Sequence, residues 1–200
     1  MCYGLAMNPA RRRATYEDLL QVPDILIAEI IDGELYTFPR PASPHARTTS
    51  VLRGGLDPFD QRPGGPGGPP GGWWILFEPE LHFGADILVP DLAGWRRERM
   101  PVLANVPYFE LAPDWVCEVV SPTTGRIDRV RKMPVYAREQ VQFVWLVDPL
   151  MRTLEIYCLE GQRWVVVNTY GGEDQVRAEP FEALALDMGR WWLETESTEG

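Results

Sequence analysis

The hydrophobic and polar positions of the first third of the chain predict a short helix followed by a β-hairpin. Two β-prone runs flank the Asp-Gly pair at 32–33, and this pair between such runs is a strong signal of a tight hairpin turn. We therefore predict strands over 26–31 and 34–38. Ahead of them, Thr15 is a suitable N-cap for a short helix that carries acidic residues in its first turn.

The middle of the chain mixes helical and extended patterns. A helix-compatible segment runs from about 44 to 56. Residues 61–72 are almost wholly proline and glycine, which predicts a mobile surface loop because they bury too little side chain to offset the cost of ordering. Apolar strands are predicted over 73–83 and 86–95, the second ending on the Pro-Asp pair at 90–91.

The last third predicts a buried strand, a helix and a further strand. An apolar run over 115–122 is interrupted only by Glu118, as in strands that are buried on both faces. Residues 123–140 are helical in pattern, and 143–149 form the next strand. Two alternating segments then predict a final hairpin. This order predicts a mixed α/β domain with a central mixed sheet flanked by helices and with hairpins towards both ends.

We expect one domain. Residues 13–193 would form it, with the 61–72 loop inside it, and residues 1–12 and 194–200 would be a disordered leader and a tail. Either Met1 or Met7 is a suitable start.

Composition narrows the class of protein. No run of about eighteen apolar residues occurs and the N-terminus lacks the pattern of a signal peptide, which predicts a cytoplasmic protein without a membrane partner. The three cysteines have no CxxC spacing, so they indicate neither a disulfide framework nor a zinc ribbon. The net charge of −10 argues against broad, sequence-independent binding of nucleic acid, although a carboxylate-rich metal site adds negative charge of its own.

Three polar residues occur where a core-building pattern would not place them. Asp91 ends a predicted strand, Glu118 interrupts an apolar strand, and Lys132 is the only lysine among nineteen basic residues. Two neighbouring carboxylates repel each other unless a divalent cation such as Mg²⁺ binds both. A nearby ammonium would then orient or help to deprotonate an attacking water and steady a phosphate, which indicates phosphodiester hydrolysis.

Several motifs follow one another in a recognisable order. They are Glu29 within AEIIDGELY (28–36), His45 within SPHAR (43–47), Pro90-Asp91, Glu118 within EVVSP (118–122), then Asp128, Lys132 and Tyr136 at four-residue spacing, and FVWLVDP (143–149). In this order they resemble the Uma-two family of restriction-endonuclease-like proteins, within the PD-(D/E)XK nuclease superfamily. The similarity covers roughly residues 15–170, which is most of the chain.

The resemblance implies a restriction-endonuclease-like core in which Asp91 and Glu118 bind Mg²⁺ or Mn²⁺. One feature departs from the superfamily pattern, because Val120 stands where a lysine is expected two residues after the glutamate. The resemblance places that lysine on the following helix, at Lys132. Pro134 could kink or restart this helix and so weaken the alignment of its polar residues on one face.

Each candidate residue also has a simpler interpretation. Asp91 could be a solvated turn residue, and Glu118 could pair with a core arginine. Lys132 could lie on the surface and pair with a carboxylate one turn earlier. Glu29 could be an exposed hairpin residue, and His45 could cap or pack at a helix start.

Two further patterns bear on partners. The arginine-rich segments 96–99 and 126–132 each follow a predicted site strand, and together they would place positive charge at the rim of an acidic pocket.

Trp191 and Trp192 could cover a self-association surface or belong to the core. Tyr136 is interpreted as a packing residue with its hydroxyl near the site.

These patterns lead to one function hypothesis and two alternatives. The hypothesis is a Mg²⁺-dependent endonuclease-like hydrolase that acts on DNA, and the sequence leaves open whether it works as a homodimer. Asp91 and Glu118 would hold the metal, Lys132 would position water or phosphate, and Glu29 and His45 would assist. The alternatives are a binding or assembly module without catalysis and a hydrolase of another phosphate ester.

Overall fold

The structure is a computed structural model that describes residues 12–194 of the chain. The predicted start at Met7, nearly all of the predicted leader and nearly all of the predicted tail lie outside the described residues. The elements, in chain order, are α1 (Tyr16–Leu19), β1 (Leu26–Ile31), β2 (Glu34–Pro39), α2 (Ser43–Gly55), β3 (Trp73–Phe77), β4 (Leu81–Phe83), β5 (Asp86–Leu88), β6 (Leu92–Arg96), β7 (Trp115–Val119), α3 (Gly125–Ile127), the π-helix η1 (Asp128–Lys132), α4 (Met133–Arg138), β8 (Phe143–Asp148), β9 (Thr153–Glu160), β10 (Arg163–Gly171), β11 (Gln175–Val176), β12 (Leu186–Asp187) and the 3₁₀-helix η2 (Met188–Arg190).

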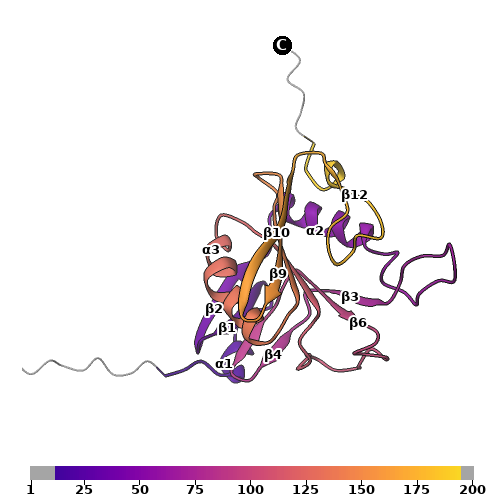
Figure 1. Cartoon of the computed structure of the whole chain (residues 1–200). Coiled ribbons are helices and arrows are strands. Elements are labelled where there is room, and N and C mark those ends of the chain that lie inside the picture. The colour runs from indigo at the N-terminus through magenta and orange to yellow at the C-terminus, as the bar shows by residue number, and fades with distance from the viewer. Residues whose placement is uncertain (1–11, 195–200) are drawn as a thin grey trace, which may run out of the picture.

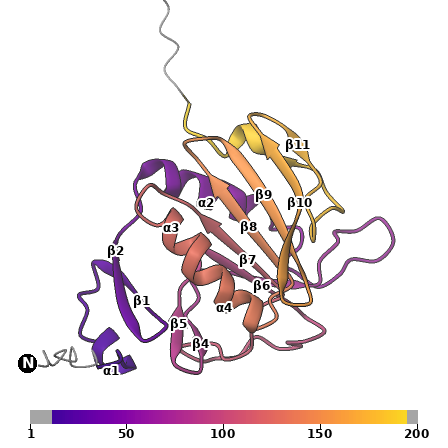
Figure 2. The ribbon, with the colours of Figure 1, turned by 60° about the vertical axis from the view of Figure 1, so that its left-hand side comes forward.

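A mixed sheet forms the centre of the fold, as predicted. Its strand order is β10-β9-β8-β7-β6-β3. β7 and β8 run parallel, and their crossover passes through α3, η1 and α4, as a parallel connection requires. A smaller sheet in the order β2-β1-β5-β4 contains the predicted N-terminal hairpin, and Figure 2 shows it beside the lower end of the central sheet. The hairpin turn uses positive φ at Asp32 (55°) and Gly33 (80°), as a type I′ turn needs.

The two faces of the central sheet pack against different partners. Trp115 and Cys117 of β7 belong to a core cluster that also contains Leu52 of α2. Val116, from the other face of β7, packs in a second cluster with Tyr136 of α4, and Figure 2 shows α3 and α4 lying across the sheet in front of β7 and β8. Since side chains alternate along a strand, Glu118 lies on the same face as Val116, beneath the crossover helices.

The predicted single strand over 86–95 is wrong. The chain leaves the small sheet after β5 and enters the central sheet at β6, with Pro90 between them. Proline cannot donate to a sheet ladder, which suits the point where the chain changes sheets. Asp91 therefore precedes β6 and does not end a strand. The apolar run 73–83 is likewise divided, with a turn at Glu78, whose φ is 44°.

Pro134 does not break the crossover helix. The helix widens into the π-turn η1 directly before it, and the amide of Met133 donates to the carbonyl of Asp128, five residues earlier. A π-turn changes the pattern of backbone hydrogen bonds in the helix directly before Pro134, which has no N–H to donate. Lys132 and Tyr136 consequently remain on the helix face that meets the sheet, both buried.

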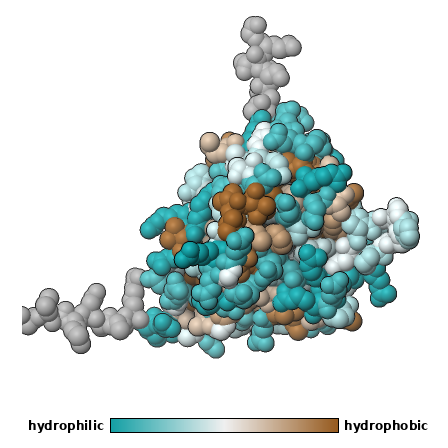
Figure 3. Space-filling model, in the orientation of Figure 1, coloured by the Kyte–Doolittle hydropathy of each residue, from teal (hydrophilic) through white to brown (hydrophobic). Residues whose placement is uncertain are grey.

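The surface carries two further features. Residues 61–72 project from the body of the molecule as an extended loop (Figure 1). The face in Figure 3 is largely hydrophilic, with a hydrophobic cluster over the β9–β10 hairpin, where Val165, Val166 and Val167 are exposed. Trp191 and Trp192 are buried in the core, so the idea that they cover a self-association surface is wrong. In the described range, no helix has the length and apolar character needed to cross a bilayer.

Candidate active site

Asp91 and Glu118 meet because of the register between β6 and β7. Leu92 pairs with Cys117 in this antiparallel ladder, so the preceding Asp91 comes opposite Glu118, and opposite residues project to the same face. Asp91 Oδ2 also accepts a hydrogen bond of 2.7 Å from the amide of Val119. The pair of carboxylates predicted from the sequence is therefore brought together in space.

Lys132 lies at the centre of three buried carboxylates. Its Nζ is 2.9 Å from Glu29 Oε1, 3.3 Å from Glu118 Oε2 and 3.4 Å from Asp128 Oδ1. Tyr136 completes the environment of Glu118, because its hydroxyl donates to Glu118 Oε1 over 2.5 Å. This agrees with the prediction of a packing tyrosine whose hydroxyl is near the site.

Burial and mutual repulsion dominate the ionisation of this cluster. Burial raises the pKa of Glu118 well above its ordinary value, the Lys132 charge opposes this, and Asp128, Asp91 and Glu29 raise the pKa further. Burial likewise raises the pKa of Glu29 and of Asp128, against the attraction of Lys132. Burial lowers the pKa of Lys132, but the three carboxylates outweigh it and hold that pKa well above the ordinary value. A pKa held above the ordinary value favours the charged ammonium of Lys132, which suits it to positioning negative charge.

His45 reaches the site from the start of α2. Pro44 occupies the first turn of this helix, where a missing N–H is tolerated. The imidazole Nε2 lies 3.1 Å from Asp91 Oδ1, and Nδ1 lies 3.4 Å from the hydroxyl of Thr49. Burial lowers the pKa of His45, but the hydrogen bond and charge of Asp91 outweigh it, so the pKa is raised.

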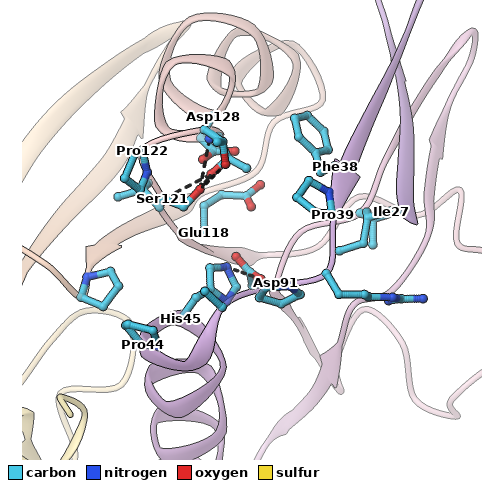
Figure 4. Close-up of a pocket in the computed structure, with 18 of the residues that line it drawn as sticks. Ile27, Phe38, Pro39, Pro44, His45, Asp91, Glu118, Ser121, Pro122 and Asp128 are labelled. Atoms are coloured by element: carbon cyan, nitrogen blue, oxygen red, sulfur yellow. Dashed lines mark hydrogen bonds and ion pairs between the residues drawn. The ribbon is translucent and has the colours of Figure 1, made fainter. Parts of the chain in front are cut away.

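The carboxylates form the floor of an open cavity of about 330 Å³ (Figure 4). Figure 4 shows Glu118 and Asp91 near its centre, with Phe38 and Pro39 to one side and Pro122 to the other. All five predicted site residues line this cavity: Glu29, His45, Asp91, Glu118 and Lys132.

Several simpler interpretations are therefore wrong. Lys132 is 5 % exposed and Glu29 is fully buried, so neither is a surface residue. The buried cation that pairs with Glu118 is this lysine and not an arginine. His45 contacts a site carboxylate in addition to packing at its helix start.

The prediction that two arginine-rich segments place positive charge at the border of the cavity is wrong for the first segment, residues 96–99. Residues 96–99 follow the C-terminal end of β6, whereas the site lies at its N-terminal end, so this segment is at the far end of the strand. In the second segment, Arg129 pairs with Glu155 and Arg131 with Asp32. Arg40 lines the cavity instead. Sequence reasoning missed it, and its place directly after the predicted hairpin that carries Glu29 is the signal that could have indicated it.

The donor chemistry of the floor fits a hard divalent cation. Within residues 12–194, no cluster of three or more His, Cys, Asp or Glu side chains is arranged as a metal site, and the Lys132 ammonium already lies among Glu29, Glu118 and Asp128. Mg²⁺ is nevertheless usually bound through one or two carboxylates and keeps several waters, which Asp91 and Glu118 suffice to provide. The buried Oε2 of Glu29 has no hydrogen-bond partner and is a further unused acceptor in this charge-rich site.

Comparison with known proteins agrees with this fold. A family model described as "Putative restriction endonuclease", Uma2, matches residues 14–189. The crystal structure of a putative nuclease belonging to DUF820 from Anabaena variabilis is similar, with a TM-score of 0.69, 21% sequence identity and coverage of 89% of this chain and 97% of that chain. A search of curated proteins finds no match.

The central mixed sheet and the family match thus define a restriction-endonuclease-like, nuclease-like protein. The similar crystal structure, at its low identity, supports the fold alone. The family match spans most of the chain, and the protein belongs to the Uma2 family, as the motif order predicted.

Proposed function

We propose that the protein is a Mg²⁺-dependent hydrolase that cleaves phosphodiester bonds in DNA. The observation that carries the proposal is the pairing of Asp91 with the buried Glu118 at the floor of an open cavity, beside a lysine held in place by carboxylates. Burying several carboxylates together is costly, Lys132 and His45 offset only part of their charge, and a divalent cation that binds both Asp91 and Glu118 would lower the remaining cost.

Asp91 and Glu118 are the residues that would hold the metal. Bound there, Mg²⁺ would supply Lewis acidity towards a phosphate and a water molecule. The chain's own residues prepare the two ligands. Tyr136 and Lys132 orient the two oxygens of Glu118, while His45 and the Val119 amide orient those of Asp91. Ligands held by such neighbours bind metal better than free ones.

Lys132 and Glu29 have supporting roles in this proposal. The Lys132 ammonium offsets part of the negative charge on the floor and helps an anionic phosphate to approach. Glu29 fixes the lysine, since its Oε1 accepts from Nζ and also from the amide of Val89 at 2.7 Å. Its second oxygen, Oε2, is buried and has no hydrogen-bond partner among the described residues.

The test combines metal binding with cleavage. Titration calorimetry with Mn²⁺ on the wild type, Asp91→Ala and Glu118→Ala is expected to show binding in the wild type only, and supercoiled plasmid is expected to be nicked in Mg²⁺ by the wild type and not by Lys132→Met. Asp114→Asn is the matched control, because Asp114 is also buried but pairs with Arg99 at the opposite end of β7. It should retain metal binding and nicking.

The outcome separates the proposal from its alternatives. Equal, weak Mn²⁺ binding in the wild type and both alanine variants would refute a shared cation and favour a nuclease-shaped binding module. Metal binding that depends on both carboxylates, combined with hydrolysis of a simple phosphodiester but not of plasmid, would favour a different phosphate ester as substrate.

A further inference from the structure

The cavity above the carboxylates has apolar walls over an acidic floor. Ile27 and Phe38 line it from the N-terminal hairpin, and Pro122 and Leu150 line it from the loops that follow β7 and β8. Leu150 is 62 % exposed at this border. Figure 4 shows the ring of Phe38 and Pro122 on opposite sides of Glu118. A substrate that enters the cavity must therefore pass apolar surfaces before it reaches the carboxylates.

The long cationic side chains of the cavity are already engaged. Of the described lining residues, Arg40 and Lys132 are the arginine and lysine. Arg40 Nη2 donates to the carbonyl of Asp24 over 2.8 Å, and its Nη1 lies 3.4 Å from Glu78 Oε2. Lys132 is surrounded by carboxylates. Duplex DNA is bound chiefly through positive side chains on its phosphates, and these walls offer little of that chemistry.

The floor is also too deeply placed for a paired backbone. Glu118 is 3 % exposed and lies inside a cavity of about 330 Å³, a size within the range of pockets that enclose one small molecule. In a duplex the bases are stacked and paired, so no base can enter such a space. Enzymes whose pocket must admit a base take single strands or a nucleotide extruded from the stack.

We propose that this cavity takes one unpaired nucleotide of a DNA strand, with its base against Phe38 and its phosphodiester at Asp91 and Glu118. This inference rests on the proposed function and names its substrate class, single-stranded DNA in preference to a continuous duplex. Stacking of a base on an aromatic ring tolerates any sequence, because every base has a π-face. Phe38 is accordingly the residue that favours single-stranded over double-stranded DNA.

The test measures binding, so that it does not depend on cleavage. Fluorescence anisotropy of a labelled 12-nucleotide single strand and of the matching duplex is recorded with the full chain and Ca²⁺, a hard cation for the carboxylates. We expect the single strand to bind at least about tenfold tighter. Phe38→Ala should weaken single-strand binding by about 5- to 150-fold, and Phe38→Leu, which keeps an apolar side chain in the hairpin, by at least about fivefold.

Leu35→Ala is the matched control. Leu35 lies in the same strand, is exposed and does not line the cavity, so its loss should leave the affinity unchanged. Equal or tighter duplex binding, unchanged affinity in Phe38→Leu, or no binding of either DNA would overturn the inference. Single-strand binding of the expected pattern without cleavage in Mg²⁺ would refute the proposed hydrolysis and leave the recognition intact. Preferential cleavage of duplex would support the proposed hydrolysis and refute the preference for single strands.

Discussion

Lys132 Nζ lies 2.9 Å from Glu29 Oε1, and this contact ties the crossover helix to the N-terminal hairpin. The same ammonium reaches Glu118 and Asp128. A lysine carries three N–H donors on one compact centre, whereas the guanidinium of arginine is a planar fork. Three carboxylates that converge from a hairpin, a central strand and a helix therefore suit lysine, which explains physically why this position differs from the arginines elsewhere in the chain.

Replacing this lysine should destabilise the fold strongly. Lys132→Met leaves three buried carboxylates without their cation, and breaking a buried ion pair in this way typically costs about 3–5 kcal/mol. Urea denaturation at neutral pH measures the free energy of unfolding. The neighbouring Arg131→Met is the control, because Arg131 is exposed and lies 3.6 Å from Asp32, a surface pair worth about 0–1 kcal/mol. Similar losses in the two variants would contradict the central role of Lys132.

A divalent cation should stabilise the wild-type chain. A ligand that binds only the folded state adds about 2.7 kcal/mol at a concentration of 100 times its Kd, so the melting temperature should rise with Mn²⁺ and fall back when a chelator is added. In Asp91→Ala and Glu118→Ala the melting temperature should not respond. Thermal denaturation monitored by circular dichroism measures the shift. A rise of the same size in Asp91→Ala would place the ion elsewhere.

The Tyr136 hydroxyl should matter to both stability and metal affinity. Tyr136→Phe removes the donor to Glu118 Oε1 and leaves a buried acceptor unsatisfied, at a cost of about 1–3 kcal/mol. Loss of a residue that orients a metal ligand usually weakens metal binding by about 10- to 100-fold. Calorimetry with Mn²⁺ and urea denaturation measure the two effects.

Tyr157→Phe is the control for that variant. Tyr157 also donates to a carboxylate, that of Glu155, and burial together with this bond raises its pKa to about 12. Its position in β9 is not among the cavity-lining residues. It should affect stability without changing Mn²⁺ affinity, and a loss of affinity in this variant would mean that general destabilisation accounts for both results.

A side chain added at Gly94 should lower the stability of the fold. A Cβ at this position in β6 would lie 3.2 Å from Trp115 Cε3 and 3.3 Å from Trp73 Cε3, and overpacking a core typically costs about 1–3 kcal/mol. Gly94→Ala is therefore expected to lower the free energy of unfolding by that amount in urea. Gly54→Ala, in α2, meets no atom within 4 Å and should be neutral or slightly stabilising, since alanine favours helix more than glycine does. Equal stability in both variants would contradict tight packing along β6.

Local signals in the sequence were sufficient for much of the fold. The Asp-Gly pair at 32–33 specified the hairpin, because positive φ at two consecutive residues is a property of those residue types. Glu118 within an apolar run indicated both a buried strand and a charge that needs a partner. The lone Lys132 and the order of the motifs pointed to the family, which the family match confirms.

Other features depend on contacts between segments far apart in the chain. Pro90 lies between two sheets. The sequence of residues 86–95 has the pattern of one strand, and only the pairing of β5 with β1 and of β6 with β7 divides it into two. The antiparallel direction of β6 carries residues 96–99 away from the site, and strand direction cannot be read from an arginine cluster.

The meeting of Glu29 with Lys132 and the place of Arg40 in the cavity wall likewise arise from the docking of the hairpin against the crossover helix. Local propensity acts over a few residues, so the sequence determined the elements and the types of residue in the site. Long-range packing decided which of those residues share one buried, charge-coupled space, because only packing excludes the water that would otherwise separate them.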